Sequence, residues 1–384
     1  MIYKEFQGLK LSALGMGTVR LPITSENSAD VNIPAVEKMV DAAIAQGVNY
    51  FDLGWDYHGC RAETIVSQSL LRYPRDSYYL ATKFPGYYPD KLDKVEEIFE
   101  EQLRHCGVDY FDFYLLHNVC EANIDAYLDP KYGIIDYLLK QKEAGRIRHF
   151  GFSTHGEVEN IRAFLDAAGQ HMEFCQIQLN WLDWTFQRAK EKVALLRERN
   201  IPVWVMEPLR GGKILLKLAE EHVKRLQILR PEETVYGWGL RFLQTIPEVT
   251  MTLSGFSSVE HVMENTKTFS EEKPLTPEEW DVLQSIAETL KQKSSVPCTA
   301  CRYCVSHCPQ QLNIPKLLEF YNEQSVSGGG FIAPRAMMAL PEQQRATACI
   351  GCGSCETFCP QNIKISGAMA ALVQWAEEFF KPKA

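Results

Sequence analysis

The sequence lacks long apolar runs and any surplus of basic residues. No apolar run approaches the roughly 18–20 residues that cross a bilayer, and the opening MIYKEFQGLK contains no apolar signal-peptide core. The net charge of −9 argues against a nucleic-acid partner, because binding a phosphate backbone needs clustered Lys and Arg. We therefore expect no membrane and no nucleic-acid partner, and a cytoplasmic location.

Cysteine is sparse in the first three quarters of the chain, where none has a cysteine neighbour. A disulfide-rich secreted protein is therefore not indicated, and a reducing cytosol favours free thiols at these positions. They are Cys60, Cys106, Cys120 and Cys175. The other cysteines fall between Cys298 and Cys359 at repeated spacings, which is typical of a metal site.

Residues 11–256 alternate short apolar, β-branched or aromatic runs with longer stretches of helical periodicity. This alternation is typical of βα units and a parallel sheet. A closed (β/α)8 TIM barrel fits best, although periodicity alone leaves an open doubly wound sheet as an alternative. No strand-to-helix turn carries GxGxxG, which argues against the open sheet. The eight candidate strands are residues 11–18, 48–55, 78–84, 110–118, 147–155, 174–181, 202–209 and 248–256.

A second, smaller domain is expected after a helix near residues 258–268 and a polar boundary over 271–297. Roughly 40 residues separate its two cysteine motifs, and they include the glycine-rich SVSGGGF. We predict a barrel domain over residues 1–280 and a mainly helical, ferredoxin-like domain over residues 281–384.

The second domain carries the pattern C-x2-C-x2-C-x3-C-P twice without deviation. The motifs are Cys298, Cys301, Cys304, Cys308 and Pro309, then Cys349, Cys352, Cys355, Cys359 and Pro360. Structural zinc is the alternative, but zinc ribbons usually show two separated CxxC pairs. The pattern predicts two [4Fe-4S] clusters and one-electron transfer.

These motifs resemble those of two-cluster ferredoxins, in which the fourth cysteine of each motif binds the other cluster. The resemblance implies that Cys298, Cys301, Cys304 and Cys359 hold one [4Fe-4S] cluster. It implies that Cys349, Cys352, Cys355 and Cys308 hold the second.

Four polar residues fall at or just beyond the C-terminal ends of consecutive candidate strands, where barrel enzymes place their chemistry. The residues are Asp52, Tyr57, Lys83 and His117. Here the chain resembles the aldo-keto reductase family, whose catalytic Asp, Tyr, Lys and His occur in this order and at similar spacings. Further matches over residues 1–270 are GMGT (15–18), FDLGWDYHG (51–59), ATKF (81–84), LLHN (115–118), GRIRHFGFS (145–153) and EHVMEN (260–265).

The four residue types suit carbonyl reduction, which needs a hydride at carbon and a proton at oxygen. A phenol is a poor acid at neutral pH unless its anion is stabilised. Tyr57 is the expected proton donor, Lys83 paired with Asp52 would favour the tyrosinate, and His117 would orient the carbonyl oxygen. Taken singly, each residue also has an ordinary structural explanation, such as a core histidine or an ion pair.

The resemblance also implies a nicotinamide site along the same strand ends. Ser153 and Gln176 match the family's carboxamide contacts, PLRGGK (208–213) its pyrophosphate loop, and Glu264 with Asn265 its adenine end. Met206 stands where an aromatic residue usually stacks, Thr154 replaces the common Asn, DLG (52–54) replaces DTA, and Gly255 and His261 replace basic residues. NADP and NAD therefore both stay open, and a flavin is a further alternative. The other expected contacts are Gly17, Thr18, Leu209, Gly211, Gly212, Phe256 and Ser257.

Our first interpretation is an oxidoreductase that interconverts a carbonyl and an alcohol, coupled to or supported by two clusters. Its expected partners are a small-molecule carbonyl or alcohol substrate and a redox partner protein. The alternative is an iron–sulfur electron carrier, or a flavin-mediated electron-transfer protein, whose barrel does no aldo-keto reductase chemistry. A test of nicotinamide binding would separate the two. Nicotinamide moves two electrons and each cluster moves one, so direct exchange between them needs a mediator such as a flavin.

Overall fold

The computed structural model describes residues 1–216 and 218–381. Contacts divide the chain into two compact units. The first comprises Met1–Gly211 and Val223–Asp281, and the second comprises Gly212–His222 and Val282–Ala384. The grouping of residues 212–222 with the C-terminal residues is a feature that local sequence patterns did not indicate.

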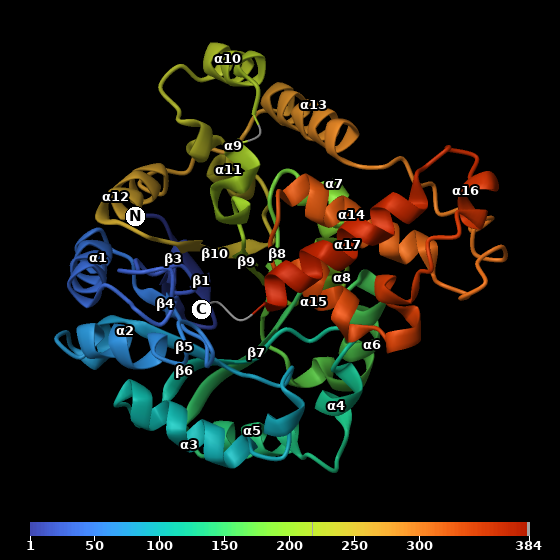
Figure 1. Ribbon diagram of the computed structural model, residues 1–384. Coiled ribbons are helices and arrows are strands. Elements are labelled where there is room, and N and C mark those ends of the chain that lie inside the picture. Colours follow the sequence, from blue (N-terminus) through green and yellow to red (C-terminus); the bar gives the residue numbers. More distant parts are fainter. Residues whose placement is uncertain (217, 382–384) are drawn as a thin grey trace. The chain divides into compact units, whose positions relative to one another are not determined.

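The first unit is built on a closed barrel of eight parallel strands (Figure 1). Each strand pairs with its neighbour in chain order, and β10 closes the barrel by pairing with both β9 and β3. The predicted (β/α)8 barrel is thus confirmed. Its strands are β3 (Leu14–Gly17), β4 (Tyr50–Asp52), β5 (Tyr79–Phe84), β6 (Phe111–Leu116), β7 (Ile147–Thr154), β8 (Cys175–Gln178), β9 (Val203–Met206) and β10 (Val249–Gly255).

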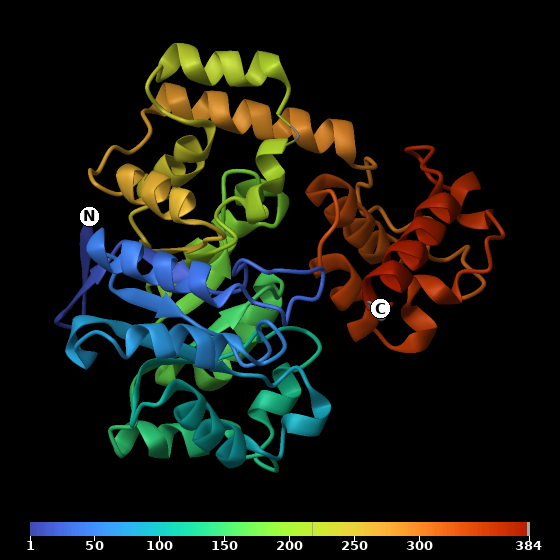
Figure 2. The ribbon, with the colours of Figure 1, turned by 60° about the vertical axis from the view of Figure 1, so that its left-hand side comes forward.

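Helices surround these strands (Figures 1 and 2). Helix α3 shows why they form: Ile98, Phe99 and Leu103 recur at helical spacing on its buried face, and Gly107, with φ of 63°, ends it in the left-handed conformation. The helices of this unit are α1 (Ile33–Ala45), α2 (Ala62–Leu70), α3 (Val95–Cys106), α4 (Ile124–Leu128), α5 (Ile134–Glu143), α6 (Val158–Ala168), α7 (Asp183–Phe186), α8 (Ala189–Glu198), α11 (Val235–Gln244) and α12 (Val259–Thr268). Near the unit boundaries lie α9 (Lys213–Leu216), α10 (Glu220–Leu229) and α13 (Pro277–Ser294).

An N-terminal hairpin, which the sequence patterns did not predict, precedes the barrel. Its strands β1 (Tyr3–Phe6) and β2 (Leu9–Ser12) pair antiparallel around Gln7 and Gly8, whose φ angles are 48° and 83°. The single strand predicted over residues 11–18 is therefore divided, with β2 ending before β3 begins. The division lets Phe6 and Leu11 join the apolar core of the barrel, and that burial stabilises the hairpin.

The C-terminal part of the second unit is helical, as expected. Helices α14 (Ile314–Ser327), α15 (Ile332–Ala339) and α17 (Ile365–Phe380) share one apolar core, while α16 (Ser354–Thr357) is a single turn. The glycine-rich segment lies between α14 and α15, where Gly328 ends α14 with φ of 69°. Among the described residues, no helix combines the length and apolar character needed to span a membrane.

Candidate functional site

An enclosed ion pair lies at the C-terminal ends of two adjacent strands. Lys83 on β5 donates from Nζ to Oδ1 of Asp52 on β4 over 2.6 Å, and it also donates to the Leu53 carbonyl. Both side chains are almost fully buried. Burial raises the pKa of Asp52, while the Lys83 ammonium and the Gln176 amide oppose that rise.

Tyr57 and His117 complete the group of four predicted residues, and the structure brings all four together. The Lys83 ammonium lies 5.1 Å from the centre of the Tyr57 ring. The rings of Tyr57 and His117 meet edge to face with their centres 5.8 Å apart. The Tyr57 ring also lies over Gly54, where a β-carbon would stand 2.7 Å from the ring.

Two tyrosines after β5, to which the sequence patterns assigned no role, border this group. The Tyr87 hydroxyl lies 3.3 Å from His117 Nδ1, and the Tyr88 hydroxyl donates to Asp56 over 3.2 Å. Burial, followed by the charge of Asp56, raises the pKa of Tyr87 well above its ordinary value. Tyr87 is therefore a neutral neighbour of His117. Both tyrosines lie in the loop after the matched segment ATKF. Because loop residues follow no helical or strand periodicity, the sequence pattern could not predict their contacts.

Ser153 and Thr154, predicted to contact a cofactor, hold the loop that carries His117. Ser153 Oγ accepts a hydrogen bond from the Asn118 amide over 2.8 Å. Thr154 Oγ1 donates to the Val119 carbonyl over 2.5 Å. Both side chains are buried, so these bonds order the loop directly after His117.

Gln176, on β8, has a buried side chain that interacts with Asp52. Its side chain is 3% exposed, and its Oε1 has no hydrogen-bond partner among the described residues. A buried carbonyl oxygen without a donor is costly, so this position suits a ligand with an N–H group. A carboxamide is such a ligand.

The segment after β9 adopts an unusual backbone. Glu207, Arg210, Gly211 and Gly212 all have positive φ angles, at 53°, 48°, 63° and 83°. The Arg210 guanidinium is buried against the Asp183 carboxylate, with Nε 3.0 Å from Oδ2. This pair, which the sequence patterns missed, fixes the start of the predicted pyrophosphate loop.

The remaining predicted contacts lie at or after the ends of β3, β9 and β10, or on α12. Thr18, after β3, donates from Oγ1 to the Asp52 carbonyl over 2.8 Å, and Asn265 donates to Ser254 over 2.8 Å. Gly17 ends β3 and Met206 ends β9. Gly255 ends β10, and Phe256 after it is buried. The Ser257 amide lies 3.4 Å from His261 Nδ1, and Glu264 is exposed. The Leu209 side chain occupies the space that a β-carbon of Gly239 would need.

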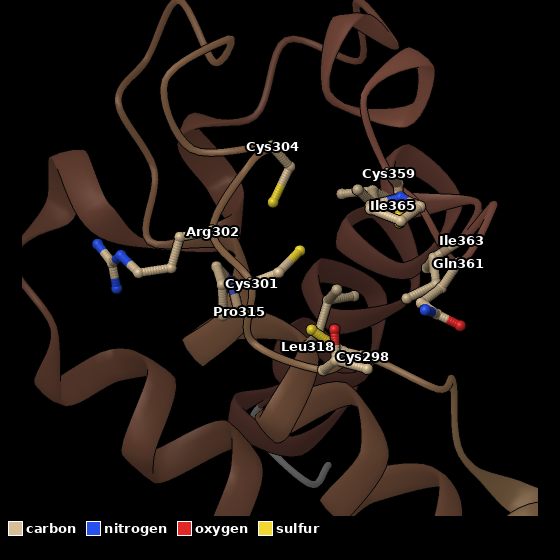
Figure 3. Close-up of a pocket in the computed structure, with 12 residues that line it drawn as sticks. Cys298, Cys301, Arg302, Cys304, Pro315, Leu318, Cys359, Gln361, Ile363 and Ile365 are labelled. Atoms are coloured by element: carbon tan, nitrogen blue, oxygen red, sulfur yellow. The ribbon is translucent and has the colours of Figure 1, made fainter.

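Two hollows lined by cysteines lie within the second unit. Cys298, Cys301 and Cys304 line the first from one loop, and Cys359 faces them from the other side (Figure 3). This hollow spans about 310 Å³, which includes space open to solvent. The structure thus places the last cysteine of the second motif with the first three cysteines of the first motif.

The second hollow has the reciprocal arrangement, in which the last cysteine of the first motif lies with the first three cysteines of the second motif. Cys349, Cys352 and Cys355 line it together with Cys308, and it spans about 360 Å³, which includes space open to solvent. Among the described residues, no three His, Cys, Asp or Glu side chains are grouped closely enough to hold a single metal ion. Outside the two motifs, Cys106 and Cys175 are buried free thiols, Cys120 is partly buried, and Cys60 is exposed.

Comparison with family models agrees with this division. Residues 13–288 match the aldo/keto reductase family model, which covers more than half of the chain. The chain belongs to the aldo/keto reductase family. Residues 297–363 match the 4Fe-4S dicluster domain, so this family member carries an iron–sulfur domain after its barrel.

Individual relatives of this aldo/keto reductase match its barrel part. An uncharacterized oxidoreductase of Bacillus subtilis is 26% identical over 72% of this chain and 93% of its own length. The NADH-specific methylglyoxal reductase of Escherichia coli is 23% identical over 74% of this chain and 97% of its own.

Solved structures show the same fold. An aldo-keto reductase from Bacillus halodurans in its holo form has a TM-score of 0.61 at 23% identity, covering 74% of this chain and 96% of its own. One from Klebsiella pneumoniae, in complex with NADPH, has a TM-score of 0.59 at 21% identity, covering 75% and 96%. The chain is an oxidoreductase of this family with an additional C-terminal domain.

Proposed function

We propose that this aldo/keto reductase interconverts a carbonyl and an alcohol, with Tyr57 as the acid and base. One observation carries the proposal: the buried Lys83 ammonium, held by Asp52, lies 5.1 Å from the centre of the Tyr57 ring. A fixed cation in a buried site stabilises negative charge that develops on a phenol oxygen. Lys83 is therefore suited to favour the tyrosinate that remains after proton transfer.

Each residue of the group has a distinct part in this proposal. In reduction, the Tyr57 hydroxyl donates its proton to the carbonyl oxygen of the substrate. Asp52 keeps Lys83 oriented, and His117, beside Tyr57 and Tyr87, orients the carbonyl oxygen. In oxidation, Tyr57 accepts the proton instead. A bound nicotinamide would supply the hydride for reduction and accept it in oxidation.

The described residues fit a nicotinamide. Gln176 Oε1 is buried without a partner and could accept a hydrogen bond from the carboxamide N–H. The relatives give no single coenzyme, since one is named NADH-specific and another was solved with NADPH. The proposal therefore covers both NAD and NADP. If cofactor extraction yields a flavin instead, the proposed nicotinamide is wrong.

Tyr57→Phe provides the test. We expect kcat for methylglyoxal reduction to fall roughly 100-fold or more, because positioned acid catalysis contributes about 10²–10⁴-fold. NADH and NADPH should bind as to the wild type. Tyr236→Phe, which removes an exposed hydroxyl from α11, is the matched control and should leave kcat unchanged. Full activity in Tyr57→Phe would contradict the role of this tyrosine.

For the C-terminal domain, taken as residues 281–384 after a barrel domain of residues 1–280, we propose two [4Fe-4S] clusters. Cys298, Cys301, Cys304 and Cys359 would hold one, and Cys349, Cys352, Cys355 and Cys308 the other, as the two hollows suggest. Such clusters transfer single electrons, so a redox partner protein is part of this proposal. Anaerobic purification should yield about eight irons and eight sulfides per chain.

The same preparation tests the electron-carrier alternative, which the two cysteine hollows favour. If NADH and NADPH fail to bind while the clusters are intact, the barrel does no nicotinamide chemistry and the carrier function replaces our proposal. If a nicotinamide binds without bleaching the clusters, hydride chemistry runs independently of them.

A further inference from the structure

His58 directly follows Tyr57, in a turn with an unusual backbone. His58, Gly59 and Cys60 have φ angles of 54°, 63° and 64°, so three consecutive residues are left-handed. This conformation is uncommon for residues other than glycine, and it persists only where the surrounding structure holds it. The His58 side chain is only 8% exposed, so the residues around it can hold the turn in place.

Both ring nitrogens of His58 bond to the backbone of the segment after β3. Nε2 lies 3.1 Å from the Leu21 amide nitrogen, and Nδ1 lies 2.7 Å from the Ser28 carbonyl oxygen. An amide N–H can only donate and a carbonyl oxygen can only accept, so Nε2 is the acceptor and Nδ1 carries the proton. These partners fix His58 as a neutral imidazole in a single tautomer.

The segment that His58 binds is a loop closed on itself. Ile23 and Val31 form an antiparallel bridge between its two sides. Ser28 lies within the bridged loop and Leu21 lies just before it, so the imidazole contacts the segment at two separate points. A side chain that is bonded at both ring nitrogens is locked in one rotamer. His58 therefore ties the turn after Tyr57 to this loop.

Further contacts join the same loop and turn. Arg61 Nη1 donates to the Ala29 carbonyl over 2.6 Å, and a β-carbon at Gly59 would stand 3.0 Å from the Ala29 side chain. The Arg61 amide in turn donates to the Tyr57 carbonyl over 3.2 Å. Tyr57 thus belongs to the turn that His58 holds, and a shift of this turn would move the phenol.

We propose that His58 is a positioning residue for Tyr57, a role that rests on the proposed function. The neutral imidazole holds the turn through two backbone bonds, and the turn holds the Tyr57 ring over Gly54 and beside Lys83. His58 itself contacts neither substrate nor coenzyme in this proposal. It acts through the position of the Tyr57 hydroxyl, because a displacement of about 1 Å at a catalytic group can cost roughly 100-fold in rate.

Three variants, measured as the anaerobic holoprotein, remove the two bonds of His58 separately and together. His58→Asn keeps an N–H donor for the Ser28 carbonyl, His58→Gln keeps an acceptor for the Leu21 amide, and His58→Leu keeps neither. We expect kcat for methylglyoxal reduction to fall roughly 10-fold to 100-fold in His58→Leu and less in the other two. Binding of NADH and NADPH, followed by nicotinamide fluorescence, should not change. Weaker coenzyme binding with normal kcat would assign His58 to coenzyme binding and overturn the proposal.

A double variant tests whether His58 acts through Tyr57. Without the phenol hydroxyl there is no proton donor left to misplace, so Tyr57→Phe with His58→Leu should be no slower than Tyr57→Phe alone. Losses that multiply in the double variant would show that His58 acts by another route, and they would overturn the proposal. Full activity in Tyr57→Phe would overturn the proposed function and this inference together. Wild-type kcat in His58→Leu would overturn this inference alone.

His171→Leu is the matched control. His171 lies in the turn that leads into β8, at the opposite end of the parallel barrel from Tyr57, so this variant should keep the wild-type kcat. Circular dichroism should show every variant folded. If His58→Leu does not fold, His58→Asn and His58→Gln still provide the test, since each loses one bond. Wild-type kcat in both of them would then overturn the proposal.

Discussion

Lys83 and Asp52 form an ion pair enclosed by the barrel, with Nζ 2.6 Å from Oδ1 and both side chains nearly inaccessible to solvent. Taking two charges out of water is costly, and their mutual attraction offsets that cost only while both partners are present. The pair therefore affects folding as well as the proposed chemistry, and the two effects can be measured separately.

Lys83→Met should lower the free energy of unfolding by about 3–5 kcal/mol, because it leaves the Asp52 charge buried without a partner. Adding Asp52→Asn should recover part of this loss. Urea unfolding followed by tryptophan fluorescence provides the measurement. Arg72→Met, which breaks the exposed pair with Asp41, is the control and should cost less than about 1 kcal/mol. Equal losses in both single variants would contradict the enclosed pair.

Gly54→Ala should reduce kcat without unfolding the protein. A β-carbon at residue 54 would stand 2.7–2.8 Å from three carbons of the Tyr57 ring, so the ring must move. A displacement of about 1 Å at a catalytic group can cost roughly 100-fold in rate. Steady-state kinetics and circular dichroism check this expectation. Gly367→Ala in α17, where nothing lies within 4 Å of the new methyl group, should leave kcat unchanged.

The stability of the barrel should decrease as pH rises from 6.5, because of His105. Its hydrogen bond to the buried Glu63 raises its pKa above the ordinary 6.5, so the protonated form stabilises the folded state. That contribution, about 1 kcal/mol, is fully present below pH 6.5 and is lost as pH rises through the raised pKa.

Urea unfolding of His105→Gln from pH 6 to pH 9 tests this linkage. The wild type should be the more stable protein at pH 6, and the difference should shrink toward pH 9. His171→Gln, for which no acidic partner is seen in the described residues, is the control. A difference that stays constant over this range would show that His105 acts through packing alone.

If each cluster takes its fourth cysteine from the other motif, a double cysteine variant should lose only one cluster. If Cys298 and Cys359 hold the same cluster, as their shared hollow suggests, Cys298→Ser with Cys359→Ser should keep about four irons per chain. Iron analysis and electron paramagnetic resonance should then show the same remaining cluster as either single variant. Loss of both clusters would mean that each motif binds its own. Cys60→Ser, at an exposed thiol of the first unit, should retain about eight irons.

The regular parts of this fold were predictable because they depend on local periodicity. Residues 79–84 (YLATKF) and 111–116 (FDFYLL) are mostly apolar, and mostly apolar runs of this length are typical of strands buried on both faces. The N-terminal hairpin was not predictable in the same way. Its two strands are short and only half apolar, and its burial depends on Phe6 and Leu11 reaching a core built from distant strands.

By itself, the sequence determined the eight βα units, the helical second domain, the two cysteine motifs and the residue types at the strand ends. These features depend on spacing along the chain, which is visible without a fold. Only the tertiary structure decided that Arg20 meets Glu207, 187 residues away, or that Phe6 packs in the core of the barrel. Such contacts depend on closure of the barrel and on helix packing, which bring together residues that no local pattern relates.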